Sequence, residues 1–148
     1  FYLHNMYRDN KLAQKNGIEI NGVKIDLSKI TVPCHFVSAK EDHIAPWVAT
    51  YAGTHLIGSK KTTFTLAASG HIAGVVNPPH KNKYCYWVND KNPATPEEWL
   101  EHASQHDGSW WTHWNEWVSD YTADDIPARY IKESIEPAPG SYVTRKKC

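Results

Sequence analysis

The sequence predicts an α/β protein in which parallel strands are flanked by helices. Two runs of strand length, the apolar run at residues 34–39 and the strand-like run at 62–66, enclose a stretch of helical character that begins at Pro46. A strand, a helix and a strand in this order form a βαβ unit, which makes the two strands parallel neighbours joined by a right-handed crossover. The alternating runs within 18–25 add one hairpin, because the Asn-Gly pair between them accepts the positive φ that a tight turn needs.

Composition narrows the class of protein further. The 148 residues are enough for one domain with its own core. Lysine plus arginine equals aspartate plus glutamate at 16 each, which leaves no basic surface for nucleic acid. The mean hydropathy is −0.60, and no long apolar run predicts a transmembrane segment. Three cysteines at scattered positions do not form a disulfide framework, so we expect a protein of the reducing cytoplasm.

The N-terminal stretch, residues 1–16, has apolar residues near helical spacing. Because the chain starts at Phe1, inside this pattern, we expect the helix to enter from missing sequence and the chain to be a piece of a longer protein. Gly17 is a suitable helix stop. After the hairpin, residues 26–33 are expected to form a short turn or helical connector that leads into the first long strand.

The second half of the chain is richer in aromatic residues. We expect residues 80–90, which are basic and aromatic, to be irregular. Thr95 followed by proline and two glutamates is a typical helix start, and this helix is expected to run to about His106. A second helix follows Gly108 and carries a stripe of tryptophans. From residue 122 the chain is polar and contains prolines, which predicts a C-terminal tail over 122–148.

Two polar side chains follow the two predicted parallel strands. Asp42 comes after the strand at 34–39, and His71 follows the strand at 62–66, inside the segment Ser-Gly-His-Ile-Ala-Gly. The carboxyl ends of parallel strands meet at one edge of the sheet, where sites are built in open α/β sheets. The small neighbours of His71 give other groups access to its imidazole. His71 is therefore a candidate general base, and Asp42 is the candidate acid that orients it.

The pairing of the two residues carries this prediction. Alone, Asp42 would be interpreted as a turn or capping residue and His71 as an ordinary solvated or core histidine. An acid after one strand and a histidine after the next are the last two members of the nucleophile–acid–histidine order of α/β-hydrolases. His43, which adjoins Asp42, is interpreted as a loop residue or a wall of the substrate site.

A nucleophile for such a site is missing from the sequence. No Gly-x-Ser-x-Gly or Gly-x-Cys-x-Gly elbow occurs. Cys34 begins its strand and so lies at the opposite end of the sheet, Cys85 has no elbow glycines, and Cys148 is terminal. We therefore expect this chain to lack both the nucleophile and the oxyanion hole.

Two further patterns in the sequence resemble binding sites. His102 and His106 are spaced i, i+4 on an expected helix, but they lack the glutamate of the zinc-protease motif, so no metal site is predicted. Trp110, Trp114 and Trp117 share one face of the second helix. Such a stripe is typical of a core or an interface, and it also suits a stacking platform for a ligand.

Several blocks together resemble one family, the class I poly(3-hydroxyalkanoate) synthases, which are bacterial polyester polymerases. The resemblance covers the C-terminal part of their catalytic domain, and the blocks run in family order from near the start of this chain to its end. They are Asn-Lys-Leu at 10–12, Val-Lys-Ile-Asp-Leu at 23–27, Glu-Asp-His-Ile-Ala-Pro-Trp at 41–47, Ala-Ser-Gly-His-Ile-Ala-Gly-Val-Val-Asn-Pro-Pro at 68–79, Gly-Ser-Trp-Trp at 108–111 and Ile-Glu-Pro-Ala-Pro-Gly-Ser-Tyr-Val at 135–143.

This resemblance implies an α/β-hydrolase fold, with residues 1–121 as the C-terminal half of the catalytic domain and 122–148 as its tail. It implies an acyltransferase that polymerises (R)-3-hydroxyacyl-CoA with release of CoA and needs no cofactor. It further implies a homodimer on the surface of cytoplasmic polyester granules. Asp42 and His71 match the acid and the histidine of the family's Cys–Asp–His triad, whose cysteine lies in an elbow that this chain does not contain. The isolated chain is therefore expected to be inactive.

Several alternatives stay open at this point. His71 can activate both the thiol and the attacking hydroxyl while Asp42 orients it, or Asp42 can act on the hydroxyl while His71 serves the thiol. Outside polymerisation, the chain could be a non-catalytic module that binds granules or a ligand through its tryptophans. It could also be the tail half of another α/β-hydrolase, an esterase or a thioesterase.

Overall fold

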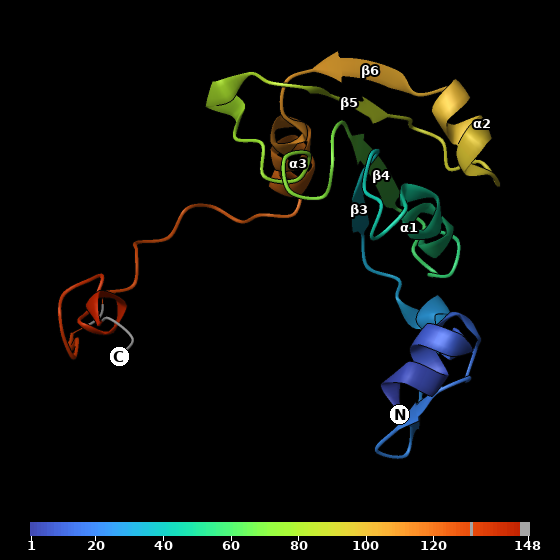
Figure 1. Cartoon of the computed structure of the whole chain (residues 1–148), viewed down its shortest axis with the longest axis horizontal. Coiled ribbons are helices and arrows are strands. Elements are labelled where there is room, and N and C mark those ends of the chain that lie inside the picture. The colour runs from blue at the N-terminus through green and yellow to red at the C-terminus, as the bar shows by residue number, and fades with distance from the viewer. Residues whose placement is uncertain (131, 146–148) are drawn as a thin grey trace.

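The computed structural model describes residues 1–130 and 132–145 and shows a mixed α/β structure with a four-stranded sheet (Figure 1). The strands lie in the order β3 (Cys34–Ala39), β4 (Thr62–Ala67), β5 (Cys85–Val88) and β6 (Ser104–Asp107). β3 and β4 are parallel, and the crossover between them contains helix α1 (Trp47–Gly53). The other two pairs are antiparallel. The predicted βαβ unit is confirmed.

The register of β3 and β4 brings their ends together. Cys34 lies opposite Thr62 at the start of the pair and Ala39 lies opposite Ala67 at its end. β-branched and aromatic residues make up most of β4, and β3 contains Phe36 and Val37, as is typical of a pleated and largely buried surface. The two loops that leave these strands therefore begin at the same edge of the sheet, as the sequence predicts.

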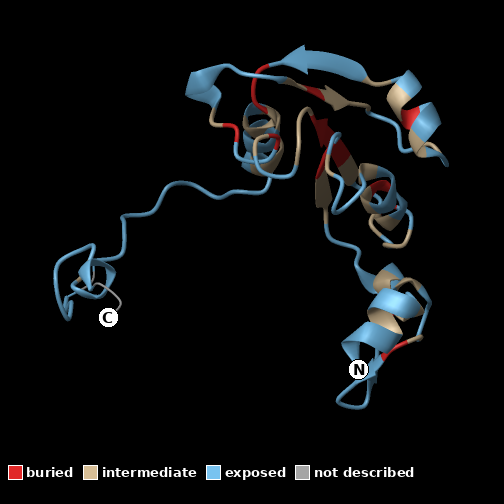
Figure 2. Ribbon diagram, in the orientation of Figure 1, coloured by how far each residue is buried: buried red, intermediate tan, exposed pale blue. Residues whose placement is uncertain are grey.

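One face of the sheet is covered by α1 and by helix α2 (Pro96–Glu101). Because alternate strand residues point to opposite faces, β4 directs Phe64 and Leu66 toward these helices. They form the core with Tyr51 and Trp99, and the ring of Trp99 lies edge-on to Phe64 at a centroid distance of 5.0 Å. Figure 2 shows this core as buried segments on β4, α1 and α2.

The opposite face is covered by helix α3 (Trp110–Ser119). His35 on β3 lies edge-on to Trp117 at 5.1 Å between ring centroids, and Tyr86 on β5 stacks on His113 at 6.1 Å. The side-chain oxygen of Ser109 accepts a hydrogen bond from the Trp111 backbone N–H, which fixes the start of this helix. The described residues thus form helices on both faces of the sheet.

The second half differs from the sequence prediction in two places. Residues 80–90, expected to be irregular, contain β5, and the helix expected to run to about His106 ends at Glu101. His106 instead lies on β6, opposite Tyr86. The reason is tertiary: the edge of β4 offers unpaired backbone groups to β5, and β5 offers its other edge to β6. This pairing outweighs the weak local preference of a segment such as Ser-Gln-His-Asp.

The N-terminal part contains shorter helices than the helix expected over 1–16. It has a π-helical stretch, η1 (Leu3–Arg8), and a 3₁₀ turn, η2 (Lys11–Ala13). Asn10 separates them with a left-handed backbone at φ +44°, which ends the helix.

The hairpin at the Asn-Gly pair is confirmed. β1 (Glu19–Ile20) and β2 (Val23–Lys24) pair antiparallel, and both turn residues have positive φ, +49° at Asn21 and +78° at Gly22. The connector at 26–33 contains the 3₁₀ turn η3 (Leu27–Lys29), capped by the Asp26 carboxylate.

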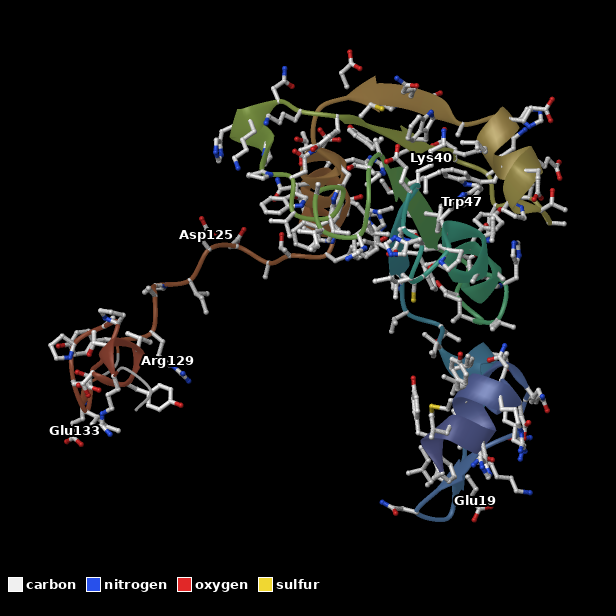
Figure 3. All side chains as sticks on the ribbon, viewed as in Figure 1. Glu19, Lys40, Trp47, Asp125, Arg129 and Glu133 are labelled. Carbon is white, nitrogen blue, oxygen red and sulfur yellow. The ribbon has the colours of Figure 1, made fainter. Side chains whose placement is uncertain are left out.

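The remaining segments are irregular or short. A 3₁₀ turn, η4 (Pro79–Lys81), precedes β5, and η5 (Tyr142–Thr144) lies near the end of the tail. Figure 3 shows Asp125 and Arg129 on this tail, away from Lys40, which follows β3, and from Trp47 at the start of α1. No helix among the described residues has the length and apolar character needed to cross a membrane. Cys148 lies outside the described residues.

The partly buried His35, which lies between β3 and α3, should make the stability of the fold depend on pH. Burial, and secondly the charge of His113, lower the pKa of His35 from 6.5 to about 4. The unfolded chain then binds one more proton than the folded chain between these values, so stability is lost as the pH falls from about 6.5 to about 4. At about 1.4 kcal/mol per pH unit, we expect roughly 2–3 kcal/mol less stability at pH 4.5 than at pH 7 from this residue.

Urea unfolding at the two pH values measures this effect. His35→Phe should reduce the pH dependence of the free energy of unfolding by that amount. The exposed His80 provides the matched control, and His80→Phe should leave the dependence unchanged. An unchanged dependence in His35→Phe would contradict the assignment.

Candidate active site

Asp42 lies in the turn that follows β3 and is held there by backbone groups. Its Oδ1 accepts hydrogen bonds from the N–H groups of Ile44 at 2.8 Å and Ala45 at 3.0 Å. The bond from Ala45 is the largest cause that lowers the pKa of Asp42, and the charges of His71 and His43 act in the same direction. Asp42 is therefore a fixed carboxylate at neutral pH, as an orienting acid requires.

His71 lies in a tight loop that follows β4. The loop begins at Ser69, whose φ of +71° is rare for a residue other than glycine, and the Glu41 backbone N–H donates to the Ser69 carbonyl at 3.0 Å. The Gly74 N–H then donates to the Gly70 carbonyl at 2.8 Å, which closes one turn around His71. The imidazole stays partly open to solvent, with 39% of its side-chain surface exposed.

The structure brings the two predicted residues together. The Nδ1 atom of His71 lies 3.7 Å from Oδ1 of Asp42, and 12% of the Asp42 side-chain surface is exposed. This distance is longer than a hydrogen bond but within ion-pair range, and catalytic contacts often tighten only when substrate binds. The Nδ1 atom faces the acid, so Nε2 is the atom left for proton transfer to a reacting group.

His43 lies next to this pair. Its ring is edge-on to the ring of His71 at 5.6 Å between centroids, and the residue is exposed. His43 thus lies in the loop beside the pair, and its role as a wall of the substrate site stays a prediction. Exposed apolar side chains, Ile44 and Ile72, flank the acid and the histidine.

Sequence reasoning gave no role to a buried polar pair that supports the histidine loop. Asn77 is 4% exposed and its Nδ2 donates to the Lys83 carbonyl at 2.8 Å. The hydroxyl of Ser109, 5% exposed, donates to the Asn77 carbonyl. Asn77 and Ser109 thus tie the exit of the loop to the start of α3. The available signal was an asparagine in front of two prolines, a position that favours extended backbone and a local turn.

The cysteines of the described chain do not complete the site. Cys34 is at the far end of β3, where its Sγ contacts the Val32 carbonyl. Burial raises the pKa of the Cys85 thiol, which disfavours the thiolate that a nucleophile needs. Among the described residues neither cysteine shares a hydrogen bond or an ion pair with His71.

The members of the predicted histidine pair and of the predicted tryptophan stripe do not lie together in the structure. His102 caps the end of α2 whereas His106 lies on β6, and the described residues contain no cluster of three or more metal-ligating side chains. Trp110 and Trp114 line an apolar groove with Val75 and Val76. Trp117 instead packs against His35, so the three tryptophans do not form one platform.

Comparison with known proteins gives relatives of one kind. The chain is 44% identical over 99% of its length to the poly(3-hydroxyalkanoate) polymerase subunit PhaC of Cupriavidus necator, of which it covers 26%. It is 42% identical over 97% of its length to the subunit of the same name from Rhizobium meliloti, covering 24% of that protein. It is 40% identical to the poly(3-hydroxyalkanoate) polymerase of Methylorubrum extorquens, over 99% of this chain and 25% of that protein. No family model matches the chain. The chain thus spans about a quarter of the length of these relatives.

Proposed function

This chain is a relative of the poly(3-hydroxyalkanoate) polymerases, matching about a quarter of their length, and we propose that it is the part of such a polymerase that carries the acid and the histidine of the active site. The observation that carries the proposal is the meeting of Asp42 and His71 at 3.7 Å, at the ends of two parallel strands. Among the described residues the outer edge of β3 has no partner strand, which suits a larger α/β-hydrolase sheet. The rest of that sheet would supply the nucleophilic cysteine and the oxyanion hole.

The proposed reaction joins (R)-3-hydroxyacyl units into polyester. His71 takes the proton of the cysteine thiol, and the thiolate attacks the thioester carbonyl of the substrate. The carbon–sulfur bond to CoA breaks, CoA leaves with a proton, and an acyl-enzyme thioester remains. The hydroxyl of a second unit then loses its proton to the base and attacks this thioester, which forms the ester bond and restores the thiol. The cycle needs no cofactor beyond the CoA thioester.

The geometry favours His71 over Asp42 as the base for both protons. Asp42 has a lowered pKa and its Oδ1 already accepts two backbone hydrogen bonds, so it is a poor proton acceptor. Asp42 instead faces Nδ1 of His71, the position from which it orients the ring and stabilises the imidazolium. We extend the proposal to the setting that the resemblance implies, a homodimer at the surface of cytoplasmic polyester granules.

Release of CoA tests the proposed function. The full-length polymerase that contains this chain should release free CoA from (R)-3-hydroxybutyryl-CoA, detected with a thiol reagent, and should form insoluble polyester in matching amount. Residues 1–148 alone should release none, because they lack the nucleophile. CoA release by the full-length protein with free hydroxy acid and no polymer would indicate a thioesterase instead.

A further inference from the structure

Two indole N–H groups reach from α3 to the backbone of the histidine loop. Nε1 of Trp111 donates to the Val75 carbonyl at 2.8 Å. Nε1 of Trp110 lies between two acceptors, the Gly74 carbonyl at 3.1 Å and the Val75 carbonyl at 3.2 Å. Both side chains belong to the first turn of the helix, directly after the capping Ser109.

The accepting carbonyls belong to the turn that carries His71. The N–H groups of Gly74 and Val76 donate to the carbonyls of Gly70 and Ile72, both at 2.8 Å, so residues 70–76 form a short coiled segment around the histidine. The two indoles hold the end of this segment. The start of the segment is fixed by the turn after β3, where the Glu41 N–H donates to the Ser69 carbonyl, so the segment is held at both ends.

The helix that provides the indoles is itself fixed on the strand that leads to Asp42. Trp117 at the other end of α3 packs against His35 on β3, and Ser109 donates to the Asn77 carbonyl. α3 therefore links the sheet beneath the acid to the loop of the histidine, and Figure 1 shows it beside the chain that leaves β4.

We propose that Trp110 and Trp111 are positioning residues, whose indole N–H groups set the place of His71 relative to Asp42; the proposal rests on the proposed function. The rings also have an apolar role, because both line the groove with Val75, Val76 and Trp114. The two roles can be separated, because phenylalanine keeps an aromatic ring but has no donor. Trp114 offers a matched control, since it lies on the same helix and no hydrogen bond of its indole is found in the described part of the chain.

The test compares Trp110→Phe, Trp111→Phe and Trp114→Phe in the full-length polymerase. We expect Trp111→Phe to lower kcat for CoA release about tenfold, with KM changed less than twofold, because loss of one well-formed hydrogen bond is worth about a factor of ten. Trp110→Phe should have a smaller effect, because its N–H is shared between two acceptors. Trp114→Phe should stay within twofold of wild type. The pH profile of kcat/KM should shift in Trp111→Phe and stay in place in Trp114→Phe, because only the first alters the surroundings of His71.

The outcomes separate this proposal from the proposed function. Equal kcat and equal pH profiles in Trp111→Phe and Trp114→Phe would overturn the positioning role. A loss in Trp111→Phe that follows a lower melting temperature, with an unshifted pH profile, would also overturn it and leave a packing role. His71→Ala in the same polymerase tests the function itself: full activity there removes the catalytic assignment, whereas an inactive His71→Ala with an unaffected Trp111→Phe removes only the positioning role.

Discussion

Replacing His71 by alanine in the full-length polymerase is expected to lower kcat for CoA release by about 10³-fold or more. The reason is that one imidazole serves both proton transfers, from the thiol and from the attacking hydroxyl. The exposed His80 lies outside the site and provides the matched control: His80→Ala should keep full activity. Circular dichroism and the melting temperature would establish that the variant is folded. A folded His71→Ala with more than a tenth of wild-type activity would contradict the role of His71 as base.

Asp42→Asn separates the two mechanisms that the sequence leaves open. If Asp42 only orients His71, the variant should lose about 10²-fold or more in the first acyl transfer and in elongation alike. If Asp42 were the base for the hydroxyl, the first transfer would persist and one equivalent of CoA would be released before the reaction stops. Rapid-quench measurement of CoA in the first turnover distinguishes these results. The lowered pKa of Asp42 and its two backbone donors lead us to expect the parallel loss.

The sequence was sufficient for the half of the fold that builds the site. The apolar run at 34–39 became β3 with the same bounds, and the next run became β4 with one residue more. These elements are specified locally: β3 is an apolar run between Pro33 and Lys40, and β4 is a threonine-rich run with Phe64 and Leu66 that is followed by small residues. The meeting of Asp42 with His71 followed from them, because parallel neighbours end at one edge of the sheet.

The parts that sequence reasoning missed depend on contacts between distant segments. β6 has a polar, exposed sequence whose strand conformation comes from pairing with β5. A helix pattern at 96–106 gave no local sign that it would end at Glu101. The hydrogen bonds that hold the histidine loop could not be predicted from the sequence either. Trp111 and Val75 are separated by 36 positions, and their contact joins a side-chain N–H to a backbone carbonyl. Such contacts require the tertiary structure.

Gly74 is expected to be the residue of the histidine loop that tolerates substitution least. A Cβ atom added there would lie 2.9 Å from the Gly70 carbonyl oxygen and 3.1 Å from Cβ of Ala39, and it would also collide with the Ala68 carbonyl. Two of these obstacles are backbone atoms, which cannot turn aside as a flexible side chain can. Gly74→Ala must therefore displace the turn that carries His71, and a displacement near 1 Å costs about 10²-fold in rate.

Gly70→Ala is the matched control, although it lies directly beside His71. A Cβ atom at Gly70 would meet only the Glu41 carbonyl oxygen, at 3.9 Å, which is an ordinary contact. We expect Gly70→Ala to stay within about threefold of wild-type kcat/KM and to raise the melting temperature slightly, because alanine restricts the unfolded chain. CoA release and thermal unfolding of both variants in the full-length polymerase provide the measurement. Equal losses of kcat/KM in the two variants would contradict this prediction. They would mean that the activity depends on small residues that leave His71 accessible, and not on the close packing of Gly74 against its neighbours.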